Sequence, residues 1–139
     1  QKEGPEVVLT KRAKTLKHHA GQIAFPGGKV EEFDLSEKQT AIRESFEEVG
    51  LQRKGVKVLG MLPRHETLTG YLISPFVGLI SKPQKLKPEA SEVSEIFSVP
   101  LKFLLNKDNT HFKHALEWNY FVGVILFYLF SRFFWKRTT

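Results

Sequence analysis

One segment restricts the fold more than any other, because residues 36–50 carry signals for both ends of a helix. Ser36 followed by Gln39 three residues later is a capping-box pattern, and Gly50 stands where a glycine commonly ends a helix. Between them, small and apolar residues recur at helical spacing. The predicted buried stripe consists of Ala41, Ile42, Ser45, Phe46 and Val49.

Short apolar runs on both sides of this helix are typical of strands. The candidates are residues 7–10, 22–25, 56–62, 71–80 and 93–99. The 71–80 run is nearly all apolar, so we expect it in the centre of a sheet. Strands before and after one strong helix predict an α/β or α+β domain with a mixed sheet, and 139 residues suit a single domain.

The composition excludes several kinds of chemistry. The chain has no cysteine, which rules out disulfides, thiolate metal sites and a cysteine nucleophile. It has no Gly-x-Ser-x-Gly elbow, which argues against covalent serine hydrolases. The net charge of +6 favours an anionic partner. A phosphate-bearing small molecule is favoured over nucleic acid, because no long basic run interleaved with aromatics is present.

The predicted helix carries a dense set of charges. Arg43, Glu44, Glu47 and Glu48 fall within six residues, and residues three or four apart share one helix face. We expect the three glutamates on the side away from Phe46 and Val49, and so away from the core. A solvated acidic face is one interpretation. The other is a metal site for a hard cation such as Mg²⁺ or Mn²⁺, which carboxylates prefer. The preceding Pro-Gly-Gly turn at residues 26–28 favours the metal, since glycines let backbone approach a ligand closely.

These residues resemble the Nudix hydrolases, whose box reads G-x5-E-x7-R-E-U-x-E-E-x-G-U, where U is a bulky aliphatic residue. Residues 43–51 match its second half, with Ser45 at the first U position. The first half departs, because Asp34 stands in place of the first Glu and eight residues separate it from Arg43. The extra residue precedes Ser36, so it need not rotate the helix. The departure leaves the role of Asp34 open.

The segment 9–28, LTKRAKTLKHHAGQIAFPGG, is similar to the signature of the coenzyme A pyrophosphatases within this family. That signature reads roughly L-L-T-x-R-[SA]-x3-R-x3-G-x3-F-P-G-G, and Lys17 stands at its second Arg. The resemblance extends over about residues 7–105. It implies the Nudix fold, a mixed sheet sandwiched between helices. The family has another strand upstream of residue 7, so the fold could be incomplete at its N-terminus.

The resemblance implies Mg²⁺- or Mn²⁺-dependent hydrolysis of the diphosphate of coenzyme A or its thioesters, giving 3′,5′-ADP and 4′-phosphopantetheine or its acyl derivative. It implies three metal ligands, namely Glu44, Glu48 and Glu47. It implies catalytic roles for Glu44, Glu47 and Arg43, with Arg43 orienting a carboxylate. The general base stays open among Glu47, Glu92 and Glu95. Contacts to the substrate are expected from Arg12, Lys14, Lys17, Gly27 and Gly28.

Two other functions remain open at this point. The substrate could be another nucleoside diphosphate derivative, such as ADP-ribose or a nucleotide sugar. The chain could also be a non-catalytic binding module with the same fold. The intact acidic residues on the helix argue against the loss of catalysis.

The C-terminal segment does not resemble the family. Residues 120–135 form a run of sixteen mostly apolar residues, interrupted by Ser131 and Arg132, which is shorter than the ~20 that span a bilayer. We divide the chain into a Nudix domain at 1–118 and an apolar segment at 119–139. A buried helix is the leading interpretation of that segment, and a membrane-associated tail or a shifted reading frame are the alternatives. Without a secretory signal or a Ser-Lys-Leu ending, the expected location is the cytoplasm, with membrane association through this tail as the alternative.

Overall fold

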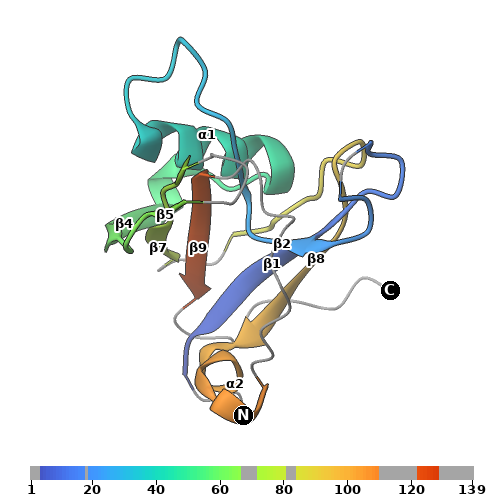
Figure 1. The fold of residues 1–139 in the computed structure, drawn as a ribbon, viewed down its shortest axis with the longest axis vertical. Helices are drawn as coiled ribbons and strands as arrows, with labels where there is room; N and C mark the ends of the chain where they lie inside the picture. The colour runs from blue at the N-terminus through green and yellow to red at the C-terminus, as the bar shows by residue number, and fades with distance from the viewer. Residues whose placement is uncertain (1–3, 18, 67–71, 81–83, 110–121, 129–139) are drawn as a thin grey trace.

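The computed structural model describes residues 4–17, 19–66, 72–80, 84–109 and 122–128 (Figure 1). The helices are α1 (Glu37–Val49) and α2 (Leu101–Leu105), with 3₁₀ turns η1 (Arg53–Gly55) and η2 (Lys107–Asn109). The strands are β1 (Glu6–Arg12), β2 (Ile23–Ala24), β3 (Gly27–Gly28), β4 (Val56–Met61), β5 (His65–Glu66), β6 (Leu72–Ile73), β7 (Phe76–Ile80), β8 (Val93–Pro100) and β9 (Val122–Tyr128).

Seven of these strands form one sheet. Its order is β2-β1-β9-β7-β4, with β8 also paired to β1 and β3 to β9. All pairings are antiparallel except that of β7 with β9, so the predicted mixed sheet of an α/β domain is confirmed. The interior position of β7, between β4 and β9, is confirmed as well. The predicted 71–80 strand is divided, because Pro75 separates β6 from β7 and cannot donate to a ladder.

The ends of α1 lie where the sequence predicts them. The Ser36 hydroxyl accepts a hydrogen bond from the Gln39 amide at 3.1 Å. Gly50 adopts φ 71°, a left-handed conformation that glycine adopts without strain, and its N–H donates to the Phe46 carbonyl at 2.9 Å. The Gln39 side chain accepts from the Leu35 amide at 2.6 Å, one residue before the cap.

The predicted buried stripe is wrong at one position. Phe46 is 53% exposed, whereas Glu48, expected on the face away from the core, is only 6% exposed. Small side chains at Ala41 and Ser45 explain the difference, because they let α1 pack closely against the sheet on that side. The Ser45 hydroxyl donates to the Ala41 carbonyl at 2.8 Å, so its burial leaves no unpaired donor. The close packing of α1 also buries Glu48, which lies on the same side of the helix as Ala41 and Ser45.

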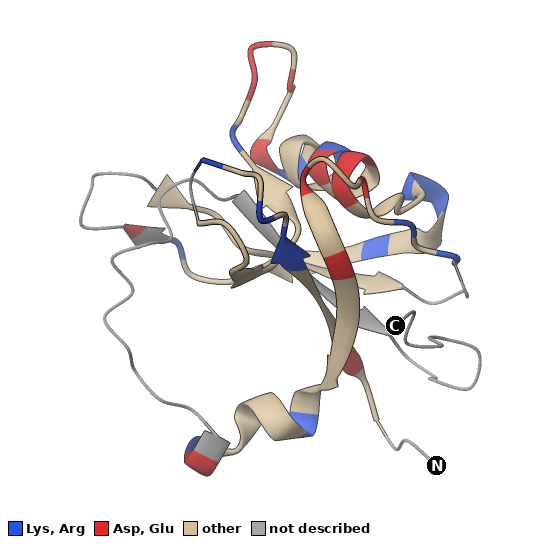
Figure 2. Ribbon diagram, turned by 90° about the vertical axis from the view of Figure 1, so that its right-hand side faces the viewer, with Lys and Arg blue, Asp and Glu red and all other residues tan. Residues whose placement is uncertain are grey.

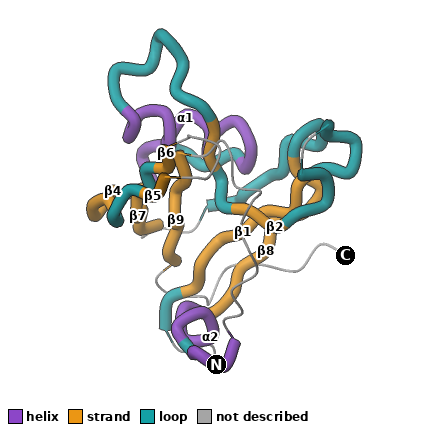
Figure 3. Tube along the Cα trace, in the orientation of Figure 1, coloured by secondary structure: helices purple, strands orange, loops and turns teal. Residues whose placement is uncertain are grey.

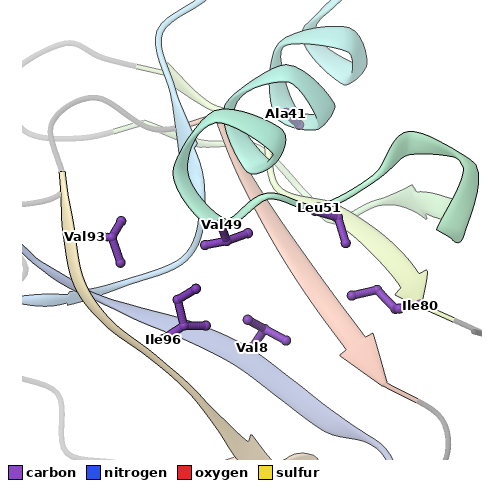
Figure 4. Close-up of a cluster of buried hydrophobic side chains, with 7 residues drawn as sticks. All are labelled: Val8, Ala41, Val49, Leu51, Ile80, Val93 and Ile96. Carbon is purple, nitrogen blue, oxygen red and sulfur yellow. The ribbon is translucent and has the colours of Figure 1, made fainter. Parts of the chain in front are cut away.

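The core lies between α1 and the sheet (Figure 4). Its buried cluster combines side chains from β1, α1, the turn after α1, β7 and β8. The members are Val8, Ala41, Val49, Leu51, Ile80, Val93 and Ile96. The turn after α1 is held to the 84–89 loop, since the Lys87 amide donates to the Val49 carbonyl at 2.9 Å. This packing fixes the orientation of α1 against the strands that face it.

The C-terminal segment contains a strand instead of the expected helix. β9 runs between β1 and β7 in the interior of the sheet, which Figure 3 shows in the tube view. The helical interpretation is therefore wrong for Val122–Tyr128, and the rest of the segment lies outside the described residues. Among the helices that the structure describes, none has the length and apolar character needed to cross a bilayer. The boundary between residues 118 and 119 stays a prediction.

Candidate metal and substrate site

Three carboxylates converge beside α1. Glu44 and Glu48 lie one turn apart on the helix, and Glu92 comes from the residue just before β8. One oxygen from each of the three lies within 4.8 Å of the others. Backbone bonds position Glu92, because its carbonyl accepts from Ala13 at 2.9 Å and the Glu89 amide donates to the Glu48 carbonyl at 2.9 Å. The cluster thus depends on contacts among three separate parts of the chain.

The electrostatics of this cluster favour a bound cation. Burial, and then the charges of Glu44 and Glu92, raise the pKa of the Glu48 carboxyl from 4.5 to about 8. Burial also raises the pKa of Glu44, against the opposing effect of Arg43. A divalent cation would relieve this repulsion, and carboxylate oxygens are the donors that Mg²⁺ and Mn²⁺ prefer. The residues present therefore fit such an ion.

Two glycines allow the backbone to approach the carboxylates. The Gly27 N–H donates to Glu48 Oε2 at 3.4 Å. A methyl group added to Gly28 would overlap the Glu44 carboxyl group. The β3 residues are held in place by pairing with β9. Glycine at position 28 is thus required for the observed place of the Glu44 side chain.

Arg43 holds the helix and the loop before it together. Its Nε and Nη2 donate to the two oxygens of Asp34 at 2.9 and 3.0 Å, and Nη2 also donates to the Lys29 carbonyl at 3.1 Å. Its Nη1 donates to Glu44 Oε1 and Glu47 Oε2, both at 3.1 Å. These contacts use the guanidinium in the bidentate geometry for which Arg is suited. Arg43 and the backbone at Gly28 thus both constrain the position of the Glu44 carboxyl group.

Asp34, whose role the sequence left open, anchors this arrangement. Its side chain is 1% exposed and also accepts from the Thr40 hydroxyl at 2.9 Å and the Glu31 amide at 2.8 Å. The hydrogen bond from Arg43 holds the pKa of Asp34 well below its usual range. The segment between Asp34 and Arg43 is one residue longer than in the Nudix box, and it still brings a carboxylate to Arg43. Figure 2 shows the acidic residues gathered on α1 and on this loop.

The other candidate residues lie at varying distances from the carboxylates. Glu47 is 51% exposed and pairs with Arg43, outside the set of three. Glu95, half-buried on β8, is also outside it. Arg12 is near, since it sits opposite Val93 and its charge lowers the pKa of Glu48.

The loop after β1 carries the remaining two candidates. Lys14 and Lys17 are exposed there, and no described contact joins them to the cluster. The sequence missed Glu92 as a member of the acidic set and named it only as a candidate base. No motif marks it, and its place just before a strand that pairs with β1 is the one signal available.

Comparison with known proteins gives consistent matches. A model of the NUDIX domain matches residues 1–118. The protein named uncharacterized Nudix hydrolase NudL from Pectobacterium atrosepticum is 43% identical over 97 residues, 70% of this chain and 50% of that protein. Its counterpart from Photorhabdus laumondii is 42% identical over 111 residues, 80% of this chain and 59% of that protein. The chain thus spans about half to three fifths of the length of these relatives.

Solved structures show the same fold at low sequence identity. A C. elegans Ap4A hydrolase binary complex has a TM-score of 0.58 and 17% identity, covering 70% of each chain. The NUDIX domain of Shewanella oneidensis NrtR, complexed with ADP ribose, has a TM-score of 0.55 and 22% identity, covering 72% of this chain and 65% of that one. The match of the domain model over most of the chain, together with this shared fold, shows that the chain belongs to the Nudix family.

Proposed function

We propose that this domain hydrolyses the diphosphate linkage of coenzyme A or its thioesters, giving 3′,5′-ADP and 4′-phosphopantetheine or its acyl derivative. The observation that carries the proposal is the convergence of Glu44, Glu48 and Glu92 beside the backbone of Gly27 and Gly28. Such a site suits a metal ion next to a phosphate group. The signature-like segment at 9–28 supports coenzyme A as the substrate.

Each side chain of the site has its own proposed role. Glu44 and Glu48 would hold Mg²⁺ or Mn²⁺, and Glu92 would be a third oxygen ligand or the base that takes a proton from water. A bound divalent ion neutralises diphosphate charge and acidifies water. Arg43 keeps one Glu44 oxygen in place through its 3.1 Å contact, while Glu47 remains a further candidate for ligand or base.

Arg12 is the residue we assign to substrate phosphate. It lies beside Glu48 and next to Ala13, whose amide bonds to Glu92. Its guanidinium can bind phosphate with two parallel hydrogen bonds. Lys17 would act at longer range as a point charge, because an ammonium lacks the planar fork of arginine.

The cytoplasmic location expected from the sequence stays a prediction.

Another nucleoside diphosphate derivative, such as ADP-ribose, is the second candidate substrate. Lys17 favours it, because the coenzyme A signature has arginine at this position. ADP-ribose carries the diphosphate but lacks the 3′-phosphate of coenzyme A. The two substrates therefore separate the metal chemistry from the recognition of the additional phosphate.

The test is incubation of the purified chain with coenzyme A and Mg²⁺ or Mn²⁺, with chromatography for 3′,5′-ADP. A parallel reaction contains ADP-ribose, and Glu48→Gln provides the inactive control. We expect metal-dependent release of 3′,5′-ADP and a higher kcat/KM for coenzyme A than for ADP-ribose. No product from either substrate would refute hydrolysis, and a preference for ADP-ribose would refute only the choice of substrate.

A further inference from the structure

A cavity of about 440 Å³ lies between α1 and β4, on the side of the helix away from the three carboxylates. Ile42 lines it, and Glu44 is two residues further along α1. Two residues correspond to about 200° around a helix with 3.6 residues per turn, so the two side chains point in nearly opposite directions. The cavity is thus a separate site on the same helix, and its volume is within the range of small-molecule pockets, about 300–1,000 Å³.

The cavity combines an aliphatic wall with basic edges. Leu35 and Ile42 contribute from the helix side, and Val56 and Val58 from β4. Leu35 is 92% exposed, so a ligand that covered it would remove apolar surface from water. The side chains of Ser36 and Gln39 also line the cavity, but both already form hydrogen bonds within the helix cap. Ser36 accepts from the Gln39 amide, and the Gln39 side chain accepts from the Leu35 amide.

The charged residues that line the cavity, among those that the structure describes, are basic. Lys38 lines it from α1 and Arg53 from η1, and none of the described residues that line it is acidic. Lys54 and Lys57 follow closely in the chain, and Figure 2 shows basic residues where η1 follows α1. The nearby acid Glu37 already pairs with Arg64 at 3.3 Å. The potential at this edge therefore favours an anionic group.

We propose that this cavity binds a small anionic amphiphile, an alkyl chain with one terminal carboxylate, with the chain against the aliphatic wall and the carboxylate between Lys38 and Arg53. The aliphatic wall selects for the chain, and the two cations select for the charge. An uncharged alcohol of equal length would leave both cations without a partner. A short carboxylate would leave the wall exposed. The combination of chain and charge distinguishes this ligand from a simple anion.

The test is calorimetric titration of the metal-free protein with decanoate below its micellar concentration, with decanol and butyrate as comparators. Chelator in the buffer keeps the measurement independent of the proposed hydrolysis. We expect saturable binding of one decanoate per chain. Decanol and butyrate should each bind at least about tenfold more weakly, a difference of about 1.4 kcal/mol or more.

Matched variants locate the binding. The double variant Lys38→Gln with Arg53→Gln should lose at least about tenfold in decanoate affinity. The double variant Lys54→Gln with Lys57→Gln removes the same charge from residues that do not line the cavity, so it should lose much less affinity, because it weakens only the general positive potential of this edge. Leu35→Asp alters only a highly exposed side chain, so it should fold and lose binding. Thermal unfolding without ligand verifies the fold of each variant.

Three results would overturn the proposal. Equal losses in the two double variants would show attraction by general charge. Normal binding by Leu35→Asp would place the ligand elsewhere. A separate binding measurement uses phosphatidylglycerol vesicles, which present negative charge without a free alkyl chain. If the protein binds these vesicles but does not bind monomeric decanoate, the basic edge is a membrane-surface patch and the proposal is wrong.

Discussion

Replacing Glu48 by Gln should stabilise the metal-free protein at neutral and basic pH, although it removes a proposed metal ligand. Glu48 is 6% exposed, and its pKa in the fold is about 8 against 4.5 for an unperturbed glutamate. The unfolded chain therefore ionises at a lower pH than the folded chain does. Gln is neutral at every pH and can still accept the hydrogen bond from the Gly27 amide.

The sign and size follow from linkage between ionisation and folding. A raised pKa in the fold gives full stability below pH 4.5, and this stability is lost as pH rises towards 8. The difference between about 8 and 4.5, at 1.36 kcal/mol per pH unit, sets a ceiling of about 5 kcal/mol. The raised pKa of Glu44 acts in the same direction. The metal-free wild type should thus lose stability across this window.

The assay is urea unfolding in chelator between pH 5 and 8.5, for the wild type, Glu48→Gln and Glu47→Gln. The free energy of unfolding of Glu48→Gln minus that of the wild type should increase steadily with pH. Glu47 is 51% exposed, so the matched control should show a flat difference. Adding Mg²⁺ at pH 8 should stabilise the wild type far more than Glu48→Gln, because ligands stabilise the state that binds them.

A flat difference between Glu48→Gln and the wild type across this pH range would refute the reasoning. It would mean that Glu48 is solvated in the folded chain and is not held among other carboxylates. Equal stabilisation of both proteins by Mg²⁺ would show that Glu48 is not part of the proposed metal site. Either result would also weaken the proposed hydrolysis, which relies on this cluster.

Three further predictions follow from the site and the sheet. Gly28→Ala should displace the Glu44 carboxyl group and weaken Mg²⁺ binding. The Tm should hardly change, because the group that must move is the end of a flexible side chain. Unchanged affinity in a Mg²⁺ titration would contradict this prediction. Arg12→Ala should lower kcat/KM for coenzyme A more than for ADP-ribose, and equal losses would mean that Arg12 supports the strand instead. Deleting residues 118–139 removes β9 from between β1 and β7, so calorimetry should show a lower Tm or loss of cooperative unfolding; a truncated form as stable as the full chain would show that β9 is dispensable.

Local signals determined much of the fold and of the site. Ser36 and Gly50 set the ends of α1 because capping satisfies backbone groups within a few residues of the cap. Short apolar runs located most strands of the sheet for a similar reason, since the strand period is visible in a few residues. The order of Arg43, Glu44 and Glu48 along the helix placed two carboxylates one turn apart.

Tertiary packing decided the rest. Phe46 and Glu48 exchanged their expected environments, because the rotation of α1 depends on which side chains let it approach the sheet. The strand β9 was mistaken for a helix, since an unbroken apolar run has no period that separates a buried strand from a buried helix. Glu92 joined Glu44 and Glu48 only through backbone contacts between distant segments, and such contacts leave no local pattern in the sequence.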